Sequence, residues 1–302
     1  MIQKSYNEVN KLYLVPTPIG NMRDITYRAV DVLNNVKIVY SEDTRVTKVL
    51  FDKYGIKTKL VSCHKFNEKT IYPQIVNNLK NGFDVALVTD RGTPLISDPG
   101  YIVSNEVIKN GFCVVSLPGP SALLPALNMS NIKADRFLFY GFLSSKQDES
   151  ILQLKLLKNI NFTLVLYESP HRLIKTLQNI KNIMGNKRIS ISREISKIHE
   201  EVFRGSVQEA IDAYYEPKGE FVIVIDNNEK LSDVNYAFDE LKELISYGMD
   251  KKGAMKYISK KYDVSKNLLY NMLEENSIWS WLLVWVILEL NLSTLDIILV
   301  FW

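Results

Sequence analysis

Short runs of apolar and β-branched residues recur through the first 118 positions and alternate with segments of helical periodicity. Each run is apolar on both faces, which is typical of parallel strands that helices cover on two sides. The runs that we interpret as strands occupy residues 12–15, 36–40, 84–88 and 112–117. Regular alternation of such strands with helices predicts an α/β domain over residues 1–118.

The segment 70–82 illustrates the helical pattern between these strands. Ile71, Ile75 and Leu79 recur at a spacing of four residues and form one apolar stripe. Thr70 is a residue type that caps helix starts, and Gly82 is one that ends helices. We therefore predict an amphipathic helix that packs this stripe against the sheet.

A second series of apolar runs follows and is again separated by helical segments. Its predicted strands occupy residues 137–140, 162–167, 188–192 and 221–225. The same layer rules predict a second α/β domain over residues 119–230. Residues 231–276 show only helical patterning, so we predict a small helical unit there.

The last segment, residues 277–302, differs in composition from everything before it and contains all four tryptophans of the chain. The longest uncharged run, residues 276–288, has 13 residues, whereas a membrane-spanning helix needs about 20. Glu289 and Asp296 interrupt the remainder. We predict that this apolar tail lies outside the functional fold and that the protein has no membrane partner. A helix on a dimer surface or a weak membrane anchor are the alternatives.

The overall composition is that of an ordinary globular protein, with 46% apolar and 24% charged residues. A net charge of +3 allows an anionic partner without requiring one. The two cysteines, Cys63 and Cys113, argue against a disulfide framework, and the N-terminal residues hold no apolar signal segment. These features favour a reducing compartment, and we predict a cytoplasmic protein.

Polar loops follow five of the predicted strands, and four of these loops contain glycine or proline. They occupy residues 15–21, 40–45, 88–100, 117–122 and 167–172. In open parallel sheets, ligands bind beyond the carboxyl ends of the strands. We therefore predict that these loops form the rim of a binding pocket; the alternative is that glycine and proline only make tight turns between strands and helices.

The common ligand motifs are absent from the sequence. It contains neither a GxxxxGK[ST] phosphate loop nor a GxGxxG dinucleotide motif, and no GxSxG nucleophile motif. The three histidines have no metal-ligand spacing, so we predict no metal. What remains is a site of backbone groups, carboxylates and hydroxyls, which suits a small polar cofactor with an amino-acid end.

Seven motifs carry a resemblance to a known family. They are LYLVPTPIGNMRDIT, SEDTR, ALVTDRGTPLISDPGY, LPGPSALLPAL, DRFLFYGFL, YESPHRL and SREISKIHEEVFRG, in this order along the chain. Together they resemble the ribosomal RNA small-subunit methyltransferase I family of the tetrapyrrole methylase superfamily, over about residues 11–275. The resemblance implies two α/β domains with S-adenosylmethionine in the cleft between them. It also implies 2′-O-methylation of a decoding-centre cytidine in 16S rRNA by a cytoplasmic homodimer.

The resemblance also implies which residues contact the cofactor. They are Pro16, Asp90, Gly92, Thr93, Pro94, Ile96, Ser121, Ala122 and Tyr167. Physically, Gly92 allows close approach of a ligand to the backbone, and Asp90 is a counter-charge for cationic groups. Asp90 is also a good turn residue, and Ser121 also a good helix cap, so the structural alternatives stay open. Arg91 departs from the family pattern, which has a small residue there. Three alternatives stay open for the Arg91 side chain: it reaches an RNA phosphate, it crowds the cofactor loop, or it points into solvent.

Transfer of a methyl group to a ribose hydroxyl requires alignment of the reacting atoms and a weak base. The candidate bases at predicted strand ends are Glu42, Asp43, Glu168, His171 and Glu194. We favour Glu168 and His171 because YESPHR places a carboxylate, an imidazole and a guanidinium within six residues. The alternative is a structural salt-bridge cluster with Arg172.

Basic residues are the candidate RNA contacts. We predict phosphate contacts for Arg45, Arg172, Arg193 and Lys197, with six lysines between residues 251 and 266 on a helix-turn-helix-like element. A solvated helix face is the alternative for these lysines. Two other functions compete: a methyltransferase acting on tetrapyrroles or other small molecules, and a non-catalytic RNA-binding homologue.

Overall fold

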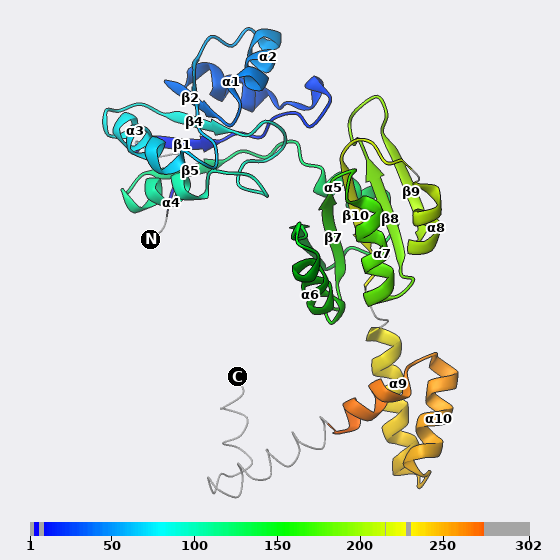
Figure 1. Cartoon of the computed structure of the whole chain (residues 1–302). Coiled ribbons are helices and arrows are strands. Elements are labelled where there is room, and N and C mark those ends of the chain that lie inside the picture. Colours follow the sequence, from blue (N-terminus) through cyan, green and yellow to red (C-terminus); the bar gives the residue numbers. More distant parts are fainter. Residues whose placement is uncertain (1–2, 6–8, 215, 228–230, 275–302) are drawn as a thin grey trace, which may run out of the picture. The chain divides into compact units, whose positions relative to one another are not determined.

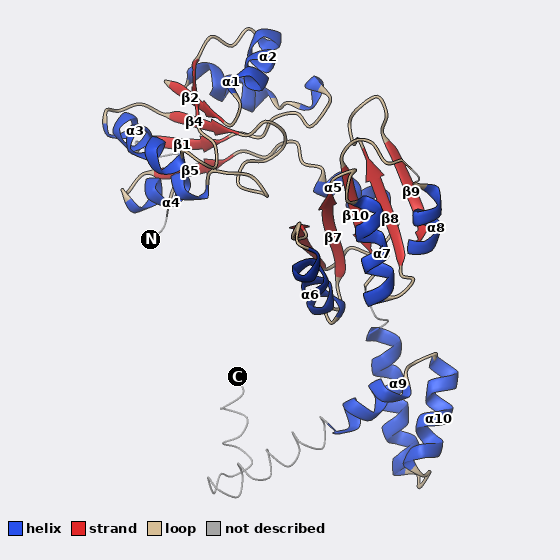
Figure 2. Cartoon of the chain, in the orientation of Figure 1, coloured by secondary structure: helices blue, strands red, loops and turns tan. Residues whose placement is uncertain are grey.

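The computed structural model describes residues 3–5, 9–214, 216–227 and 231–274. The chain divides after Asn227 into two compact units. The first unit contains two β-sheets with their helices, and the second is helical (Figures 1 and 2). The predicted α/β fold with an additional C-terminal helical region is therefore confirmed.

The first sheet is entirely parallel and has the strand order β3-β2-β4-β1-β5. Its strands are β1 (Lys11–Leu14), β2 (Ile38–Ser41), β3 (Lys59–Ser62), β4 (Val85–Val88) and β5 (Cys113–Ser116). The intervening helices are η1 (Met22–Asp24), α1 (Tyr27–Asn35), α2 (Thr44–Tyr54), α3 (Glu68–Lys80) and α4 (Tyr101–Lys109). Helices α3 and α4 pack on one face of the sheet, and α1 and α2 on the other. Burial on both faces explains why the central strands are almost wholly apolar.

Helix α3 confirms the predicted amphipathic segment. Ile75 and Leu79 of the predicted stripe are buried against the sheet, and Ile71 packs beside them. The cap position is Asn67, three residues before the predicted cap Thr70, and the helix begins at Glu68. At the other end, Gly82 takes a left-handed conformation with φ of 87° as the chain turns toward β4.

The second sheet is mixed and has the order β6-β7-β10-β8-β9. Its strands are β6 (Phe137–Phe142), β7 (Thr163–Glu168), β8 (Arg188–Arg193), β9 (Glu201–Ser206) and β10 (Phe221–Ile225). Only β6 and β7 pair in parallel; the other neighbours are antiparallel. The helices that accompany this sheet are α5 (Leu123–Ser130), α6 (Gln147–Lys158), α7 (Leu173–Met184) and α8 (Val207–Ala213).

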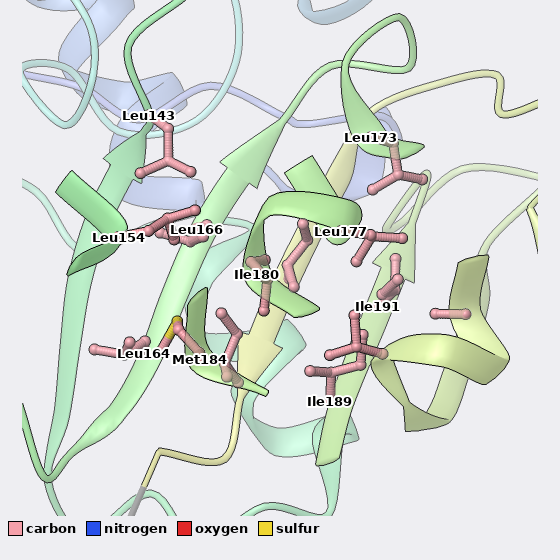
Figure 3. Packing of buried hydrophobic residues seen from close by; sticks show 14 of the residues in the cluster. Leu143, Leu154, Leu164, Leu166, Leu173, Leu177, Ile180, Met184, Ile189 and Ile191 are labelled. Carbon is pink, nitrogen blue, oxygen red and sulfur yellow. The ribbon is translucent and has the colours of Figure 1, made fainter. Parts of the chain in front are cut away.

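The core of the second sheet lies under α7. In Figure 3, Leu177, Ile180 and Met184 from this helix point toward side chains of β7 and β8, with Leu154 of α6 alongside. All of these residues are buried. Helix α5 covers the opposite face through Ala126 and Leu127. Helix α5 thereby begins directly beside the strand ends that carry the site described below.

The second unit contains α9 (Leu231–Ser246), α10 (Lys251–Tyr262) and a further helical segment at residues 266–274. Asp250 caps α10 by accepting a hydrogen bond from the Gly253 N–H at 2.9 Å. Asp263 ends this helix in a left-handed conformation, which supplies the turn before residue 266. Ala254 and Ile258 bury one face of α10 against α9.

The predicted tail, residues 277–302, lies outside the described residues. Within the part of the chain that the structure describes, no helix is long and apolar enough to cross a membrane.

Candidate active site

A cavity of about 480 Å³ lies at the carboxyl ends of strands in the first unit. All five loops singled out in the sequence contribute lining residues, for example Ile19, Glu42, Asp90, Ser121 and Glu168. The second sheet adds further lining residues: Phe142, Ile195, Glu220, Phe221 and Val222. The volume falls in the range of small-molecule sites, and most of the exposed wall is apolar.

The loop between β4 and α4, residues 89–100, has an unusual backbone. Leu95 and Ser97 are not glycines but have φ of 71° and 65°, in the left-handed region. Such conformations cost about 1–3 kcal/mol each and occur preferentially at functional sites. Gly100 has φ of 120°, and a Cβ there would lie 2.7 Å from Leu87 Cδ2. The backbone conformation of this loop therefore depends on its packing contacts and on glycine at position 100.

Contacts with two other loops fix this strained loop. The N–H and C=O groups of Thr17 and Gly92 exchange two hydrogen bonds of 2.9 Å. Thr93 Oγ1 donates to the backbone oxygen of Pro120 at 3.0 Å. Gly92 has φ of 83°, and a Cβ at this position would have its nearest neighbouring atom 3.5 Å away, so conformation rather than space requires glycine.

Five carboxylates line the cavity, and three of them, Glu42, Asp90 and Asp98, come from loops of the first sheet. Asp90 Oδ1 accepts a hydrogen bond from the Asp43 N–H at 2.9 Å, and Glu42 Oε2 accepts one from Thr89 Oγ1 at 3.2 Å. Burial raises the pKa of Asp98 to about 6, the negative charges of Glu42 and Asp90 add to this, and a hydrogen bond with Thr89 opposes it. Asp98 is thus a half-buried cavity carboxyl that titrates close to neutral pH. It was not among the predicted bases, because in the sequence it reads as a turn residue before Pro99.

Seven of the predicted cofactor contacts line the cavity: Asp90, Gly92, Thr93, Ile96, Ser121, Ala122 and Tyr167. Pro16 and Pro94 are buried and are not among its lining residues. Pro16 packs under Gly119, where a Cβ would come within 2.7 Å of the proline ring. It therefore supports the 117–122 loop from below. The roles of all nine residues in cofactor binding stay predictions.

Ser121 and Tyr167 form one wall of the cavity. Ser121 Oγ accepts a hydrogen bond from the Leu123 N–H at 3.3 Å, at the start of α5. Phe139 and Phe142 contact the Tyr167 ring edge to face, with centroid distances of 4.8 and 5.6 Å. Burial raises the pKa of Tyr167, and a hydrogen bond with Ser121 opposes this. The aromatic group fixes the Tyr167 ring, so this wall is rigid.

The YESPHR segment forms a tightly bonded cluster. Glu168 is 2% exposed, and its Oε1 accepts hydrogen bonds from Arg172 Nε and the Ser169 N–H, both at 2.8 Å. Its Oε2 accepts from Thr176 Oγ1 at 2.6 Å. His171 is exposed and is not among the lining residues of the cavity. These contacts favour the structural alternative that the sequence left open, while the catalytic roles of Glu168 and His171 remain untested predictions.

The four predicted RNA contacts all pair with carboxylates of the chain. Besides Arg172, these are Arg45 with Asp43 at 2.6 Å, Arg193 with Glu201 at 3.1 Å, and Lys197 with Glu194 and Glu220 at 2.8 and 2.7 Å. The hydrogen bonds from Arg45 lower the pKa of Asp43 to about 2. Only Arg45 is almost fully exposed, with 88% of its side chain accessible. Its accessibility makes it the most available of the four for a phosphate, and the RNA roles of all four stay predictions.

Arg91 lines the cavity and pairs with Glu220, Nη1 to Oε1, at 2.6 Å. The other carboxylate oxygen of Glu220 accepts a hydrogen bond from Lys197 Nζ. Lys197 also lies against Gly20, where a Cβ would meet its Cγ. Ser196, nearby in sequence, hydrogen-bonds to Asp24. A network of ion pairs therefore joins loops of both sheets beside the cavity, and sequence reasoning missed Glu220 because nothing in its local sequence marks it.

Among the residues that the structure describes, no group of three or more histidine, cysteine, aspartate or glutamate side chains is arranged to hold a metal ion. The donor set of the cavity is instead one of backbone groups, carboxylates, hydroxyls and an aromatic wall. Such a set suits an organic cation with polar ends.

Comparison with known proteins gives the class to which this pair of sheets and its cavity belong. The family model for Tetrapyrrole (Corrin/Porphyrin) Methylases matches residues 11–211. Among solved structures, diphthine synthase superposes with a TM-score of 0.58 at 13% identity, covering 72% of this chain and 90% of that one. Uroporphyrin-III-C-methyltransferase from Thermus thermophilus gives 0.52 at 18% identity, covering 72% and 95%. These two likenesses concern the fold.

Within this class, the chain belongs to the ribosomal RNA small subunit methyltransferase I family. It is 40% identical over 275 residues to the Bacillus subtilis (strain 168) protein of that name, covering 88% of this chain and 94% of the relative. The Escherichia coli O157:H7 relative is 36% identical, covering 89% and 96%. The Thermotoga maritima relative is 44% identical over 223 residues, which is 73% of this chain and the whole of that protein.

Proposed function

We propose that this protein transfers a methyl group from S-adenosylmethionine to the ribose 2′-hydroxyl of a decoding-centre cytidine in 16S rRNA. The observation that carries the proposal is the cavity, where strained backbone, carboxylates and an aromatic wall converge in a chain with these relatives. The name of these relatives supports small-subunit ribosomal RNA as the substrate. The family resemblance in the motifs supports the cytidine and the 2′-oxygen.

The residues present fit such a cofactor. Its sulfonium and ammonium groups are cationic, and Glu42, Asp90 and Asp98 supply negative charge in the cavity. Its carboxylate suits the start of α5 at Ser121 and Ala122, where N–H groups point outward from the helix. Ile96 and Tyr167 offer an apolar surface to its base. When bound, the cofactor supplies an electrophilic methyl group on sulfur.

We assign the proton acceptor to Asp98 in preference to Glu168. When bound, the cofactor would supply its methyl group to the ribose oxygen, and the hydroxyl proton would pass to a base of the chain. Asp98 faces the cavity and, with a pKa of about 6, is mostly ionised at neutral pH but still weakly basic. Glu168 instead has both carboxylate oxygens engaged by Arg172, Ser169 and Thr176. Its role in this proposal is to position the start of the 167–172 loop.

Further parts of the proposal rest on the resemblance and on sequence patterning. The protein acts as a cytoplasmic homodimer, and residues 1–118, 119–230 and 231–276 are its domains. The lysine-rich α10 rests on RNA phosphates, because Lys252, Lys256 and Lys260 are exposed and have no ion-pair partner among the described residues. The tail, residues 277–302, is dispensable, so a stop after Asn276 leaves methylation intact.

The test combines the protein with labelled S-adenosylmethionine and under-methylated small ribosomal subunits. We expect label in the RNA and a rate that falls steeply with salt, because each phosphate contact releases counterions. Free uroporphyrinogen serves as the competing acceptor. Efficient methylation of that acceptor, or a flat response to salt, would replace the RNA proposal with the small-molecule alternative. Cofactor binding without transfer to any acceptor would favour the non-catalytic alternative.

A further inference from the structure

Two aromatic rings stand almost free in solvent at the carboxyl edge of the first sheet. Phe66 is 90% exposed in the loop between β3 and α3, and Tyr101 is 72% exposed at the first position of α4. Tyr101 follows directly on the strained loop whose residues Ile96, Ser97 and Asp98 line the cavity. Large rings at such exposure lose the benefit of burial, and two of them on neighbouring helix starts form a candidate binding surface.

The backbone that carries these rings is rigid. Glu68 is buried, and its Oε2 accepts a hydrogen bond from the Ile102 N–H at 3.1 Å, which ties the start of α3 to the start of α4. Asn67 Oδ1 accepts from the His64 N–H at 2.7 Å, and its Nδ2 donates to the Ser62 oxygen at 3.1 Å. Phe66 and Tyr101 are therefore held near each other on fixed helix starts. Because the backbone is already fixed, the protein loses little conformational entropy when a partner stacks on these rings.

The charge around Phe66 is positive. Lys65 and Lys69 flank Phe66, both are exposed, and neither has an ion-pair partner among the residues that the structure describes. The only carboxylate in residues 62–69 is Glu68, which is buried and engaged with α4. We call Phe66, Tyr101, Lys65 and Lys69 the aromatic rim. Exposed rings interleaved with free cations are the combination that binds single-stranded nucleic acid, since bases stack on rings and phosphates approach the cations.

We propose that the aromatic rim binds unpaired nucleotides next to the methylation target, with bases stacked on Phe66 and Tyr101 and phosphates near Lys65 and Lys69. The inference rests on the proposed RNA substrate. It adds that the aromatic rim is the surface that binds the RNA and that the bound RNA is single-stranded. If the rim lay on the axis of a two-fold interface, it would face itself, and its two free lysines would meet the same two lysines of a second copy, which disfavours that occupant.

The test measures KM and kcat for small subunits with Phe66→Ala, Tyr101→Ala and the double variant. Loss of one stacking ring is expected to raise KM about tenfold, with little change in kcat. Phe66→Trp should restore the parental KM because it keeps a stacking face, whereas Phe66→Leu should not. Phe83→Ala is the matched control: Phe83 is also exposed, but it follows α3 at the opposite, amino edge of the sheet. Affinity for S-adenosylmethionine, measured by calorimetry, should be parental in every variant.

A binding experiment tests the rim independently of methylation. Fluorescence anisotropy compares a labelled unstructured oligoribonucleotide with its duplex form, using the full chain. We expect the parental protein to prefer the single strand and the double variant to lose that preference. Equal binding by the parental and double-variant proteins would overturn the inference even if methylation occurs. A change in molar mass of the double variant by light scattering, with RNA binding unchanged, would identify the rim as a contact between copies instead. A parental protein that binds the single strand through the rim but methylates no RNA would refute only the proposed function.

Discussion

Two loops that line the same cavity contrast sharply in how their polar groups are satisfied. The loop after β4 holds Leu95 and Ser97 in strained conformations and presents Asp98 to the cavity with a raised pKa. The loop after β7 buries Glu168 and gives each of its carboxylate oxygens a donor from within the loop or α7. We propose from this contrast that the first loop is reactive and the second supports it, because strained backbone and carboxyls with a raised pKa are characteristic of sites that act on a ligand.

The substitution Asp98→Asn tests the proposed difference between the two loops with the largest expected effect. Removal of the proton acceptor is expected to lower kcat by about 100-fold or more, because general-base catalysis contributes about 10²–10⁴. The affinity for S-adenosylmethionine should change only a few-fold. Rapid-quench kinetics with saturating cofactor and calorimetry give the two values. Parental turnover by Asp98→Asn would move the base elsewhere, and Glu168 and His171 would be the next residues to test.

Glu168→Ala probes the supporting loop and should act mainly on stability. It leaves the Arg172 guanidinium without its buried partner, which is expected to lower the free energy of unfolding by about 3 kcal/mol. Denaturant titration measures this loss, and the folded fraction should turn over at close to the parental rate. The control is Glu149→Ala, which removes an exposed pair with Lys146 and should cost less than about 1 kcal/mol. A large loss of kcat at unchanged stability would show that Glu168 acts in the reaction.

The raised pKa of Asp98 also predicts a pH dependence. Because the folded-state value of about 6 lies above that of an unfolded aspartate, the folded protein binds this proton more tightly. Ionisation of Asp98 therefore lowers stability as the pH rises from about 4 to 6, while activity rises through the same window. Asp98→Asn should melt higher than the parental protein at about pH 8, and the gain should vanish near about pH 4. Calorimetric melts at both pH values test this; an equal difference at both would contradict it.

The smallest expected effect concerns the ion pair beside the cavity. The Arg91 and Glu220 side chains are both more than half exposed, so their coupling should be within about 1 kcal/mol. A double-mutant cycle of Arg91→Ala and Glu220→Ala on cofactor affinity isolates this coupling, and high salt should reduce it. Glu220→Ala alone should have the larger effect, because it also removes one of the two carboxylate partners of Lys197. A coupling of several kcal/mol would mean that the network holds the cavity together.

The fold was predictable where strands are buried on both faces. The two strands missed in the sequence, β3 and β9, are both edge strands of their sheets. Their side chains are mostly half-exposed, and KLVS and EVFRGS mix polar with apolar residues, so neither forms a recognisable apolar run. Edge position is a property of the assembled sheet, and the local pattern contains no sign of it.

The site was predictable as a set of loops but not as a set of roles. Glycine and proline mark strand exits locally, so the five loops were found before their meeting point was known. Asp98 and Glu220 escaped because their importance arises from burial and from partners distant in the chain; Glu220 is 129 positions from Arg91. The hydrogen bonds of Glu168 could not be predicted for the same reason, since Thr176, which donates to it, lies a turn into the following helix.

The most direct test of the central claim locates the transferred methyl group. Small subunits incubated with isotopically labelled S-adenosylmethionine and the protein are digested, and the nucleosides and fragments are mapped by mass spectrometry. We predict label on the ribose of a decoding-centre cytidine with the parental protein, and label that accumulates about 100-fold more slowly with Asp98→Asn, which still binds the cofactor. Label on a base, on another nucleotide or on a small molecule only, or equal labelling by Asp98→Asn, would contradict the account.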